Sequence, residues 1–142
     1  MSPLSIILPC FAMVAITAAV WLRLYVVRIG EMRARHIRPQ DISTSRQAAE
    51  KLLNVNAADN FRNLFEVPVL FYVLCILALA AQTVNPTLVG GAWAFVALRA
   101  LHSFIHCTYN RVMHRFAVYM LSTLILFGLW GVFGVNLWHS QV

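Results

Sequence analysis

One stretch of the chain decides its fold: RALHSFIHCTYNRVMHRFAVY, residues 99–119. Its first part places Arg99, His102 and His106 inside a segment that is apolar enough to cross a bilayer. An arginine at the centre of a membrane helix costs roughly 2.5–3.5 kcal/mol on insertion scales, so a chain that keeps one must surround it with polar contacts. We therefore expect the other segments to form a bundle around these residues.

The composition of the chain is that of a membrane protein. Of its 142 residues, 61% are hydrophobic and 11% are charged, and the mean hydropathy is +0.72. A soluble domain of this size could not bury that much apolar surface, so lipid must cover part of it. The formal net charge of +6 does not indicate a nucleic-acid partner, because the cations lie in turns between hydrophobic segments, where they set membrane topology.

Four hydrophobic segments are long enough to span a bilayer as helices. They predict an all-α, integral membrane four-helix bundle, with one domain over residues 1–142 and spans at about 4–27, 62–81, 88–108 and 116–138.

All 11 Lys and Arg residues fall within residues 23–62 and 99–115. The positive-inside rule then makes the first and third connections cytoplasmic and both termini non-cytoplasmic. Ser45 is the expected N-cap of a further helix in the first connection.

Polar residues follow one face of the third predicted span. His102, His106 and Asn110 come three, seven and eleven residues after Arg99, and this spacing places them on one side of a helix. Because such a face is costly in lipid, it should point into the bundle or into a cavity.

The second predicted span carries a matching polar face. Its members recur at spacings of three or four: Asn56, Asp59, Asn60, Asn63 and Glu66. Glu66 is the only acidic residue within a hydrophobic run, so Arg99 and Arg62 are its expected partners.

Three interpretations of these polar groups are open: an ion-pair network that fixes helix register, a site for a small anion, or a metal or haem site. The excess of arginines over acidic residues favours the anion. His102 and His106 are four residues apart, as metal ligands on one face would be. However, no cysteine or second carboxylate stands at ligand spacing, and the arginines would repel a metal ion.

The chain resembles the MAPEG superfamily, the membrane-associated proteins in eicosanoid and glutathione metabolism, over nearly its whole length. The resemblance rests on two motifs, Arg62-Asn63-Leu-Phe-Glu66 and Arg99-x-x-His102-x-x-x-His106-x-x-x-x-Arg111-x-x-x-Arg115-x-x-x-Tyr119. It implies a homotrimer of four-helix subunits that holds glutathione between neighbouring subunits, near the cytoplasmic side. The chain is similar to bacterial-type members related to microsomal glutathione transferases, and this resemblance implies that the protein lies in a bacterial inner membrane.

The resemblance also implies roles for single residues. Those that would bind glutathione are Arg62, Asn63, Glu66, Arg99, His102, Arg111 and Tyr119. Arg115 matches the arginine that stabilises the glutathione thiolate, and a fixed guanidinium lowers the cost of forming that nucleophile. His106 stands where synthase-like members have a tyrosine, and histidine can still donate a hydrogen bond. The first-span arginine of the family's site corresponds to Arg28 or Arg33.

The expected function is that of a membrane-embedded, glutathione-dependent transferase or peroxidase acting on a lipophilic electrophile. An alternative is a non-enzymatic lipid-binding or scaffold protein that uses the groove between subunits without thiol chemistry. A redox, metal or haem module built on His102 and His106 is the third candidate. The expected partners are further copies of the chain, membrane lipid and a small lipophilic substrate.

Overall fold

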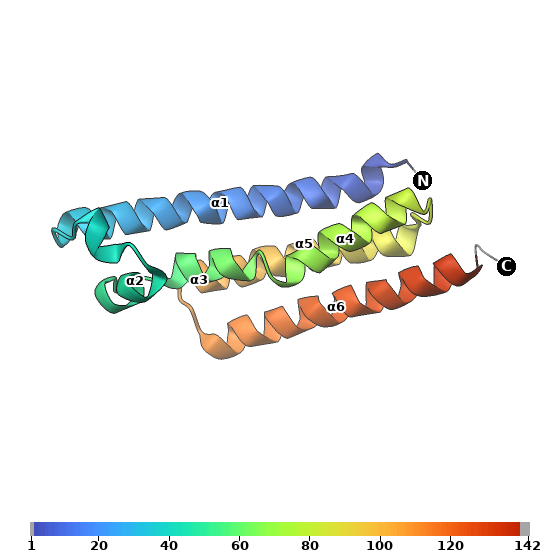
Figure 1. The fold of residues 1–142 in the computed structure, drawn as a ribbon. Helices are drawn as coiled ribbons and strands as arrows, with labels where there is room; N and C mark the ends of the chain where they lie inside the picture. The colour runs from blue at the N-terminus through green and yellow to red at the C-terminus, as the bar shows by residue number, and fades with distance from the viewer. Residues whose placement is uncertain (1, 140–142) are drawn as a thin grey trace.

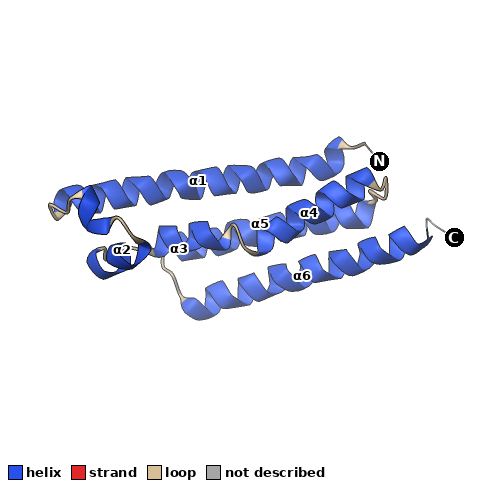
Figure 2. Ribbon diagram, viewed as in Figure 1, coloured by secondary structure: helices blue, strands red, loops and turns tan. Residues whose placement is uncertain are grey.

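The computed structural model describes residues 2–139, which are helical apart from short turns and loops (Figure 2). The elements are α1 (Leu4–Ala34), the 3-10 helix η1 (Pro39–Ile42), α2 (Ser45–Lys51), α3 (Asn56–Asn63), α4 (Val67–Ala80), α5 (Pro86–Cys107) and α6 (Val112–His139). Residues 2–139 contain no strand, and the predicted all-α class is therefore confirmed.

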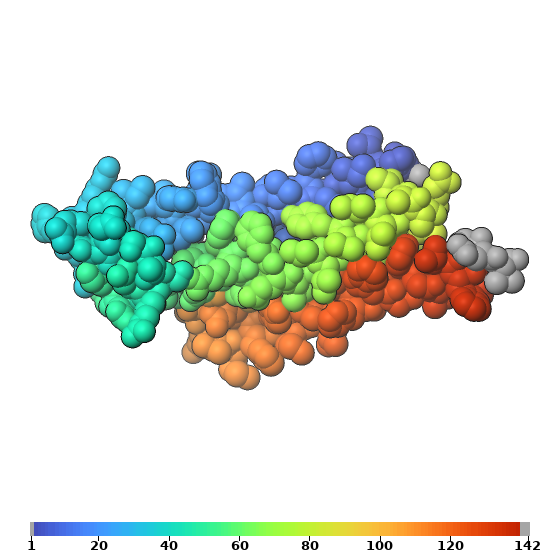
Figure 3. Space-filling model, in the orientation of Figure 1, coloured from blue at the N-terminus to red at the C-terminus, as the bar shows by residue number. Residues whose placement is uncertain are grey.

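Four helical segments are long and apolar enough to cross a membrane: α1, α3 together with α4, α5, and α6. They run along a common direction, and η1 and α2 form a cap at one end (Figure 1). The start of α1, the α4–α5 turn and the end of α6 lie at the opposite end. The space-filling view shows the resulting elongated molecule, in which the cap extends beyond α6 (Figure 3). The chain is thus a multi-pass membrane bundle whose two cation-rich connections lie toward the same end.

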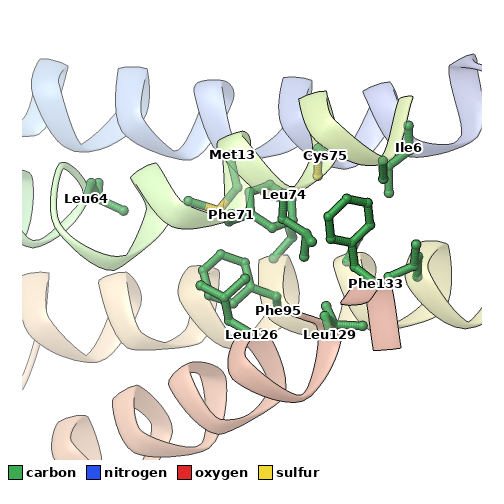
Figure 4. Packing of buried hydrophobic residues seen from close by; sticks show 14 of the residues in the cluster. Ile6, Met13, Leu64, Phe71, Leu74, Cys75, Phe95, Leu126, Leu129 and Phe133 are labelled. Carbon is green, nitrogen blue, oxygen red and sulfur yellow. The ribbon is translucent and has the colours of Figure 1, made fainter. Parts of the chain in front are cut away.

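Large apolar side chains fill the centre of the bundle. Phe71 of α4 and Phe95 of α5 stack with their ring centroids 4.8 Å apart, and both are 0% exposed. Met13 of α1 and Leu126 of α6 are also fully buried and belong to the same cluster (Figure 4). This cluster contains residues from every spanning segment, so it holds the helices that position the polar residues.

Glycine controls how closely α5 and α6 approach. A Cβ atom added at Gly91 would collide with the side chain of Leu129, whereas one added at neighbouring Gly90 would meet open space. The three glycines of α6, at positions 128, 131 and 134, also face open space within this chain. These three glycines therefore take no part in the close approach of α5 and α6.

The first helix continues to Ala34, beyond residue 27, where its expected membrane span ends. Its 31 residues reach about 46 Å at 1.5 Å per residue, which exceeds the ~30 Å hydrocarbon core of a bilayer. The helix ends in a Schellman motif, in which the N–H of Ile37 donates to the carbonyl of Met32 at 3.0 Å. His36 occupies the left-handed position of this motif, with φ 53°.

Glu31 ties the first connection back to α1. Its Oε1 atom accepts hydrogen bonds from the N–H of Leu53 at 2.6 Å and from Nη1 of Arg35 at 2.9 Å. Its Oε2 atom accepts from the N–H of Asn54 at 3.2 Å. One carboxylate therefore holds the segment that leads into α3.

The N-cap of α2 is Thr44, one residue before the predicted Ser45. The N–H of Gln47 donates to Thr44 Oγ1 at 3.3 Å, and the Gln47 side chain accepts from the N–H of Thr44 at 3.1 Å. This reciprocal pair is a capping box, which Thr44 can form and Ser45 cannot because the glutamine must stand three residues after the cap.

A turn at residues 64–66 interrupts the second hydrophobic segment, which we had expected to be one helix. Pro68, in the first turn of α4, has no N–H to donate to the carbonyl of Leu64. Glu66 adopts φ −98° and ψ −102°, outside the helical region. The predicted polar face that runs from Asn56 to Glu66 is therefore broken before its last member.

Candidate functional site

Arg99 lies at the deepest point of the polar cluster and is 0% exposed. Its Nη2 atom donates to the main-chain oxygen of Asn63 at 3.0 Å, and its guanidinium carbon lies 5.3 Å from the centre of the Tyr119 ring. Its Nε and Nη1 atoms have no hydrogen-bond partner within residues 2–139. Two unpaired donors on a buried cation are costly, so an acceptor that reached them would bind strongly.

Among the described residues, the interruption between α3 and α4 supplies the acceptor that Arg99 contacts. Asn63 is the last residue of α3, where carbonyl groups have no partner within the helix. Its oxygen is therefore available to α5, and the side chain of Asn63, which is partly exposed, takes no part in the bond. The local break in the helix thus gives Arg99 a main-chain acceptor in place of the predicted carboxylate of Glu66.

Arg115, in the first turn of α6, is fixed by neighbours from other parts of the chain. Its Nη1 atom lies 2.8 Å from Nε2 of His106 and 2.8 Å from Oδ1 of Asn110. Asn110 in turn donates its side-chain amide to Oδ1 of Asn56 in α3, also at 2.8 Å. Within the described chain, Nε and Nη2 of Arg115 make no hydrogen bond, so the guanidinium is oriented by one nitrogen and has two left for a ligand.

The hydrogen bonds determine which nitrogens of the two histidines carry protons. A guanidinium can only donate, so Nε2 of His106 accepts from Arg115 and the proton of His106 lies on Nδ1. Nδ1 of His102 lies 3.2 Å from the main-chain oxygen of Arg115, which can only accept, so this nitrogen is protonated. His106 therefore carries its proton on Nδ1, and His102 does so in its neutral form.

The remaining ring nitrogens are buried and unpaired within residues 2–139: Nδ1 of His106 and Nε2 of His102. The first is a donor and the second is an acceptor. The ring centroids are 5.6 Å apart, and the His102 ring also lies 5.7 Å from that of Tyr119. The histidines thus present one donor and one acceptor inside the bundle, next to the unpaired donors of Arg99.

A second polar contact joins α3 to α5 beside this cluster. Asn60 is 0% exposed, accepts a hydrogen bond from Oγ of Ser103 at 3.4 Å and donates to Sγ of Cys107 at 3.5 Å. Ser103 and Cys107 were not among the predicted site residues. Their spacing of four and eight residues from Arg99 would have indicated the same helix face, but neither type stands out in an apolar segment.

Three of the predicted ligand-binding residues lie outside the buried cluster. Arg62, Glu66 and Arg111 are exposed in this subunit. Arg62 pairs with Asp59, with 3.8 Å between Nη1 and Oδ1. The expected ion pair of Glu66 with Arg99 or Arg62 does not form within residues 2–139, because the turn at 64–66 removes Glu66 from the inward face of the helix.

The remaining predicted residues meet in the structure. Five of them surround one region at the contact of α5 with α6 and the end of α3: Asn63, Arg99, His102, His106 and Arg115, with Tyr119 against Arg99 and His102. The two first-span candidates, Arg28 and Arg33, lie in the last turns of α1 and form no hydrogen bond to this cluster in the described chain.

The buried cluster has a surplus of positive charge. Among residues 2–139, no carboxylate lies within ion-pair distance of Arg99 or Arg115. The same residues contain no group of three or more His, Cys, Asp and Glu side chains that could hold a metal ion. The buried cluster is therefore electrostatically complementary to an anion.

Comparison with known proteins gives one match. A model of the MAPEG family matches residues 6–135, which cover most of all four spanning segments and include every residue of the buried cluster. No curated protein and no solved structure matches the chain.

Proposed function

The chain belongs to the MAPEG family, and from this premise we propose that it is a membrane-embedded, glutathione-dependent transferase or peroxidase acting on a lipophilic electrophile. The observation that carries the proposal is the positive surplus of the cluster, with two guanidinium nitrogens of buried Arg99 that have no hydrogen-bond partner among the described residues. Glutathione is an anion with a nucleophilic sulfur, so it would supply both the missing negative charge and the chemistry.

Arg115 is the residue that would stabilise the glutathione thiolate. The contacts of Nη1 with His106 and Asn110 hold its guanidinium in one orientation. A preorganised cation beside the sulfur would lower the cost of losing the thiol proton to water. The thiolate would then attack an electrophilic carbon, and as the carbon–sulfur bond forms, the bond from that carbon to its leaving group would break, with the electron pair going to the leaving group. Because the position of Arg115 is fixed before the ligand arrives, little reorganisation is needed during the reaction.

The other predicted residues would hold the rest of the ligand. The unpaired donors of Arg99 and of His106 suit the carboxylates and carbonyl groups of a peptide. Exposed Arg62, Glu66 and Arg111 would meet the charged ends of glutathione at the mouth of the site. They face away from this subunit's core, which fits a ligand held between subunits of a homotrimer, with Arg28 or Arg33 contributed by a neighbour.

A non-enzymatic lipid-binding or scaffold function is the second candidate, and one observation favours it. An apolar groove of about 560 Å³ runs between α1 and the α3–α4 segment, with Val14, Trp21, Leu64, Val69 and Tyr72 among its lining residues. A groove of this kind could hold an acyl chain without any thiol chemistry. The same groove would also serve a lipophilic substrate that enters from the membrane, so it does not exclude the enzyme.

Glutathione titration of the purified protein in detergent, with thermal unfolding as the readout, tests the proposal. A ligand that binds only the folded state raises the free energy of unfolding, by about 2.7 kcal/mol at 100 times its dissociation constant. We expect the unfolding temperature to rise with glutathione concentration, and the Arg115→Ala variant to show a smaller rise. A wild-type protein that shows no rise, yet retains lipid in native mass spectrometry, would support the scaffold function instead.

A further inference from the structure

Two cysteine thiols meet inside the bundle, away from the polar cluster described above. Cys10 of α1 and Cys75 of α4 are hydrogen-bond partners through their side chains. Both are free thiols, and Cys75 is only 4% exposed while Cys10 is partly buried. The third cysteine of the described chain, Cys107, contacts the side-chain amide of Asn60 instead. A contact between two thiols is therefore particular to the pair of Cys10 and Cys75.

The packing of α1 against α4 brings the two thiols together. Cys10 stands four residues after Ile6 and three before Met13, so these three side chains share one face of α1. That face points inward, because Ile6 and Met13 are buried. Cys75 stands four residues after Phe71 on the inward face of α4 and belongs to the same buried cluster (Figure 4). The contact is thus held by two packed helices and not by a loop.

The hydrogen bonds distinguish the two sulfur atoms. The thiol of Cys10 donates to the main-chain oxygen of Ile6, with 3.5 Å between sulfur and oxygen. A thiol has one hydrogen to donate, so the hydrogen that lies between the two sulfur atoms belongs to Cys75. Cys10 is also the more exposed of the two residues. A reagent that enters from outside the bundle therefore meets the sulfur of Cys10 first.

A reagent that reaches this pair must dissolve in lipid. Both cysteines lie within segments that are long and apolar enough to cross the membrane. Cys10 comes six residues, or about 9 Å, after the start of α1. Apolar side chains of the buried cluster surround the pair on its inner side. A lipid-soluble oxidant therefore has access that a water-soluble one lacks.

We propose that Cys10 and Cys75 form a redox-active pair, which an organic hydroperoxide dissolved in the membrane oxidises to a disulfide. The sulfur of Cys10 attacks one oxygen of the hydroperoxide, the O–O bond breaks, and the thiol proton goes to the alkoxide, which leaves as an alcohol. The sulfur of Cys75 then attacks the resulting sulfenic acid. The S–S bond forms, the S–O bond breaks, and hydroxide leaves as water with the proton of Cys75.

The disulfide would act on the apolar groove between α1 and the α3–α4 segment. Val14 and Tyr72 line that groove, and Cys10 lies four residues before Val14 while Cys75 lies three residues after Tyr72. A covalent bond at this position fixes the separation of α1 and α4 next to the groove. The pair takes no part in the proposed glutathione site, so neither proposal depends on the other.

Thiol labelling and intact-mass measurement of the purified protein test this proposal. The protein in lipid nanodiscs is exposed to cumene hydroperoxide, then denatured, and its remaining thiols are alkylated with N-ethylmaleimide. We expect the wild type to lose two of its three alkylated thiols and two hydrogen atoms in mass. Peptide mapping should join Cys10 to Cys75. Hydrogen peroxide, which partitions poorly into lipid, should react more slowly at the same concentration.

Three variants separate the two thiols from each other and from the third cysteine. Cys75→Ala should stop at a sulfenic acid on Cys10 that dimedone traps, and Cys10→Ala should leave Cys75 unoxidised. Cys107→Ala is the matched control and should form the disulfide at the wild-type rate, all variants being compared at equal helix content. Retention of all three thiols by the wild type, loss of Cys107 as fast as Cys10, or a disulfide between two chains would overturn the proposal.

Discussion

Nε2 of His106 lies 2.8 Å from Nη1 of Arg115, and this contact joins the end of α5 to the first turn of α6. The same Arg115 contributes its main-chain oxygen to His102, one turn earlier in α5. One residue of α6 therefore orients both histidines, and its own guanidinium is oriented in return. The predictions below follow from this relationship and from the packing around it.

Arg115→Ala should reduce glutathione conjugation about 10²- to 10³-fold in kcat, the scale for loss of one preorganised group that stabilises developing charge. Arg115→Lys should recover only part of this rate, because an ammonium lacks the planar geometry that meets His106, Asn110 and a ligand together. The measurement is steady-state kinetics with a lipophilic electrophile. Arg46→Ala serves as the control for loss of a cation, and unchanged activity in Arg115→Ala would rule out the assigned mechanism.

His106→Phe should lower the free energy of unfolding by about 1.5–3 kcal/mol, since it removes an acceptor from a charged donor. His106→Gln should recover much of this loss, because its amide oxygen can accept from Arg115. Thermal unfolding in the same detergent compares the two variants. If phenylalanine and glutamine destabilise the protein equally, the contact does not orient Arg115.

Nitrogen-15 NMR of the histidine-labelled protein in lipid should show His102 and His106 as neutral rings protonated on Nδ1. This tautomer follows from the acceptor role of His106 Nε2 and the donor role of His102 Nδ1. In Arg115→Ala the constraint on His106 is removed, and its signal should shift toward the Nε2-protonated form. A wild-type His106 protonated on Nε2 would contradict the observed contact.

Arg99→Met should leave the protein without ligand at least as stable as the wild type. The substitution removes a buried cation with two unpaired nitrogens and keeps most of the side-chain volume. The same variant should lose most of the stabilisation that glutathione gives to the wild type. Paired thermal unfolding with and without glutathione measures both effects, and full stabilisation of the variant would exclude Arg99 from the ligand site.

Gly91→Val should destabilise the bundle by about 1–3 kcal/mol, because the new side chain collides with Leu129 and forces α5 and α6 apart. Gly90→Val is the matched control, since a Cβ atom at that position meets open space. The two variants carry the same chemical change one residue apart. Similar unfolding temperatures for both would mean that the approach of α5 and α6 is looser than the structure shows.

The arrangement of spanning helices could be predicted because hydropathy and charge placement are properties of whole segments. The face shared by Arg99, His102 and His106 followed from helical spacing alone, since α5 is regular through all three positions. Segment composition and helical spacing can both be read from residue types without any knowledge of tertiary contacts.

The contacts of Arg99 and Glu66 could not be predicted in the same way. Side-chain patterns suggested an ion pair between them, but the partner of Arg99 is the main-chain oxygen of Asn63, which no residue type reveals. Proline is tolerated in the first turn of a helix, so Pro68 did not by itself indicate that the chain would turn at residues 64–66. The turn places the side chain of Glu66 away from the inward face of the helix, so its predicted pairing with Arg99 was wrong.

The trimer, the bound glutathione and the contribution of Arg28 or Arg33 from a neighbour stay predictions. They concern contacts between chains or with a ligand, and the residues involved are those that a single subunit leaves exposed or unpaired. Arg62, Glu66 and Arg111 belong to this group. Cross-linking of the purified protein, followed by mass analysis, would measure the number of subunits directly.

The main-chain bond from Asn63 to Arg99 has a consequence for how the protein can evolve. A carbonyl oxygen is present whatever side chain residue 63 carries, so substitutions there leave the anchor of the deepest cation intact. The side chain at 63 is thereby left to contact a ligand without any part in holding Arg99. Residues at the exposed edge of the site can therefore change while buried Arg99 keeps its contact with the main-chain oxygen of residue 63. Such changes in ligand specificity would not require compensating changes inside the bundle.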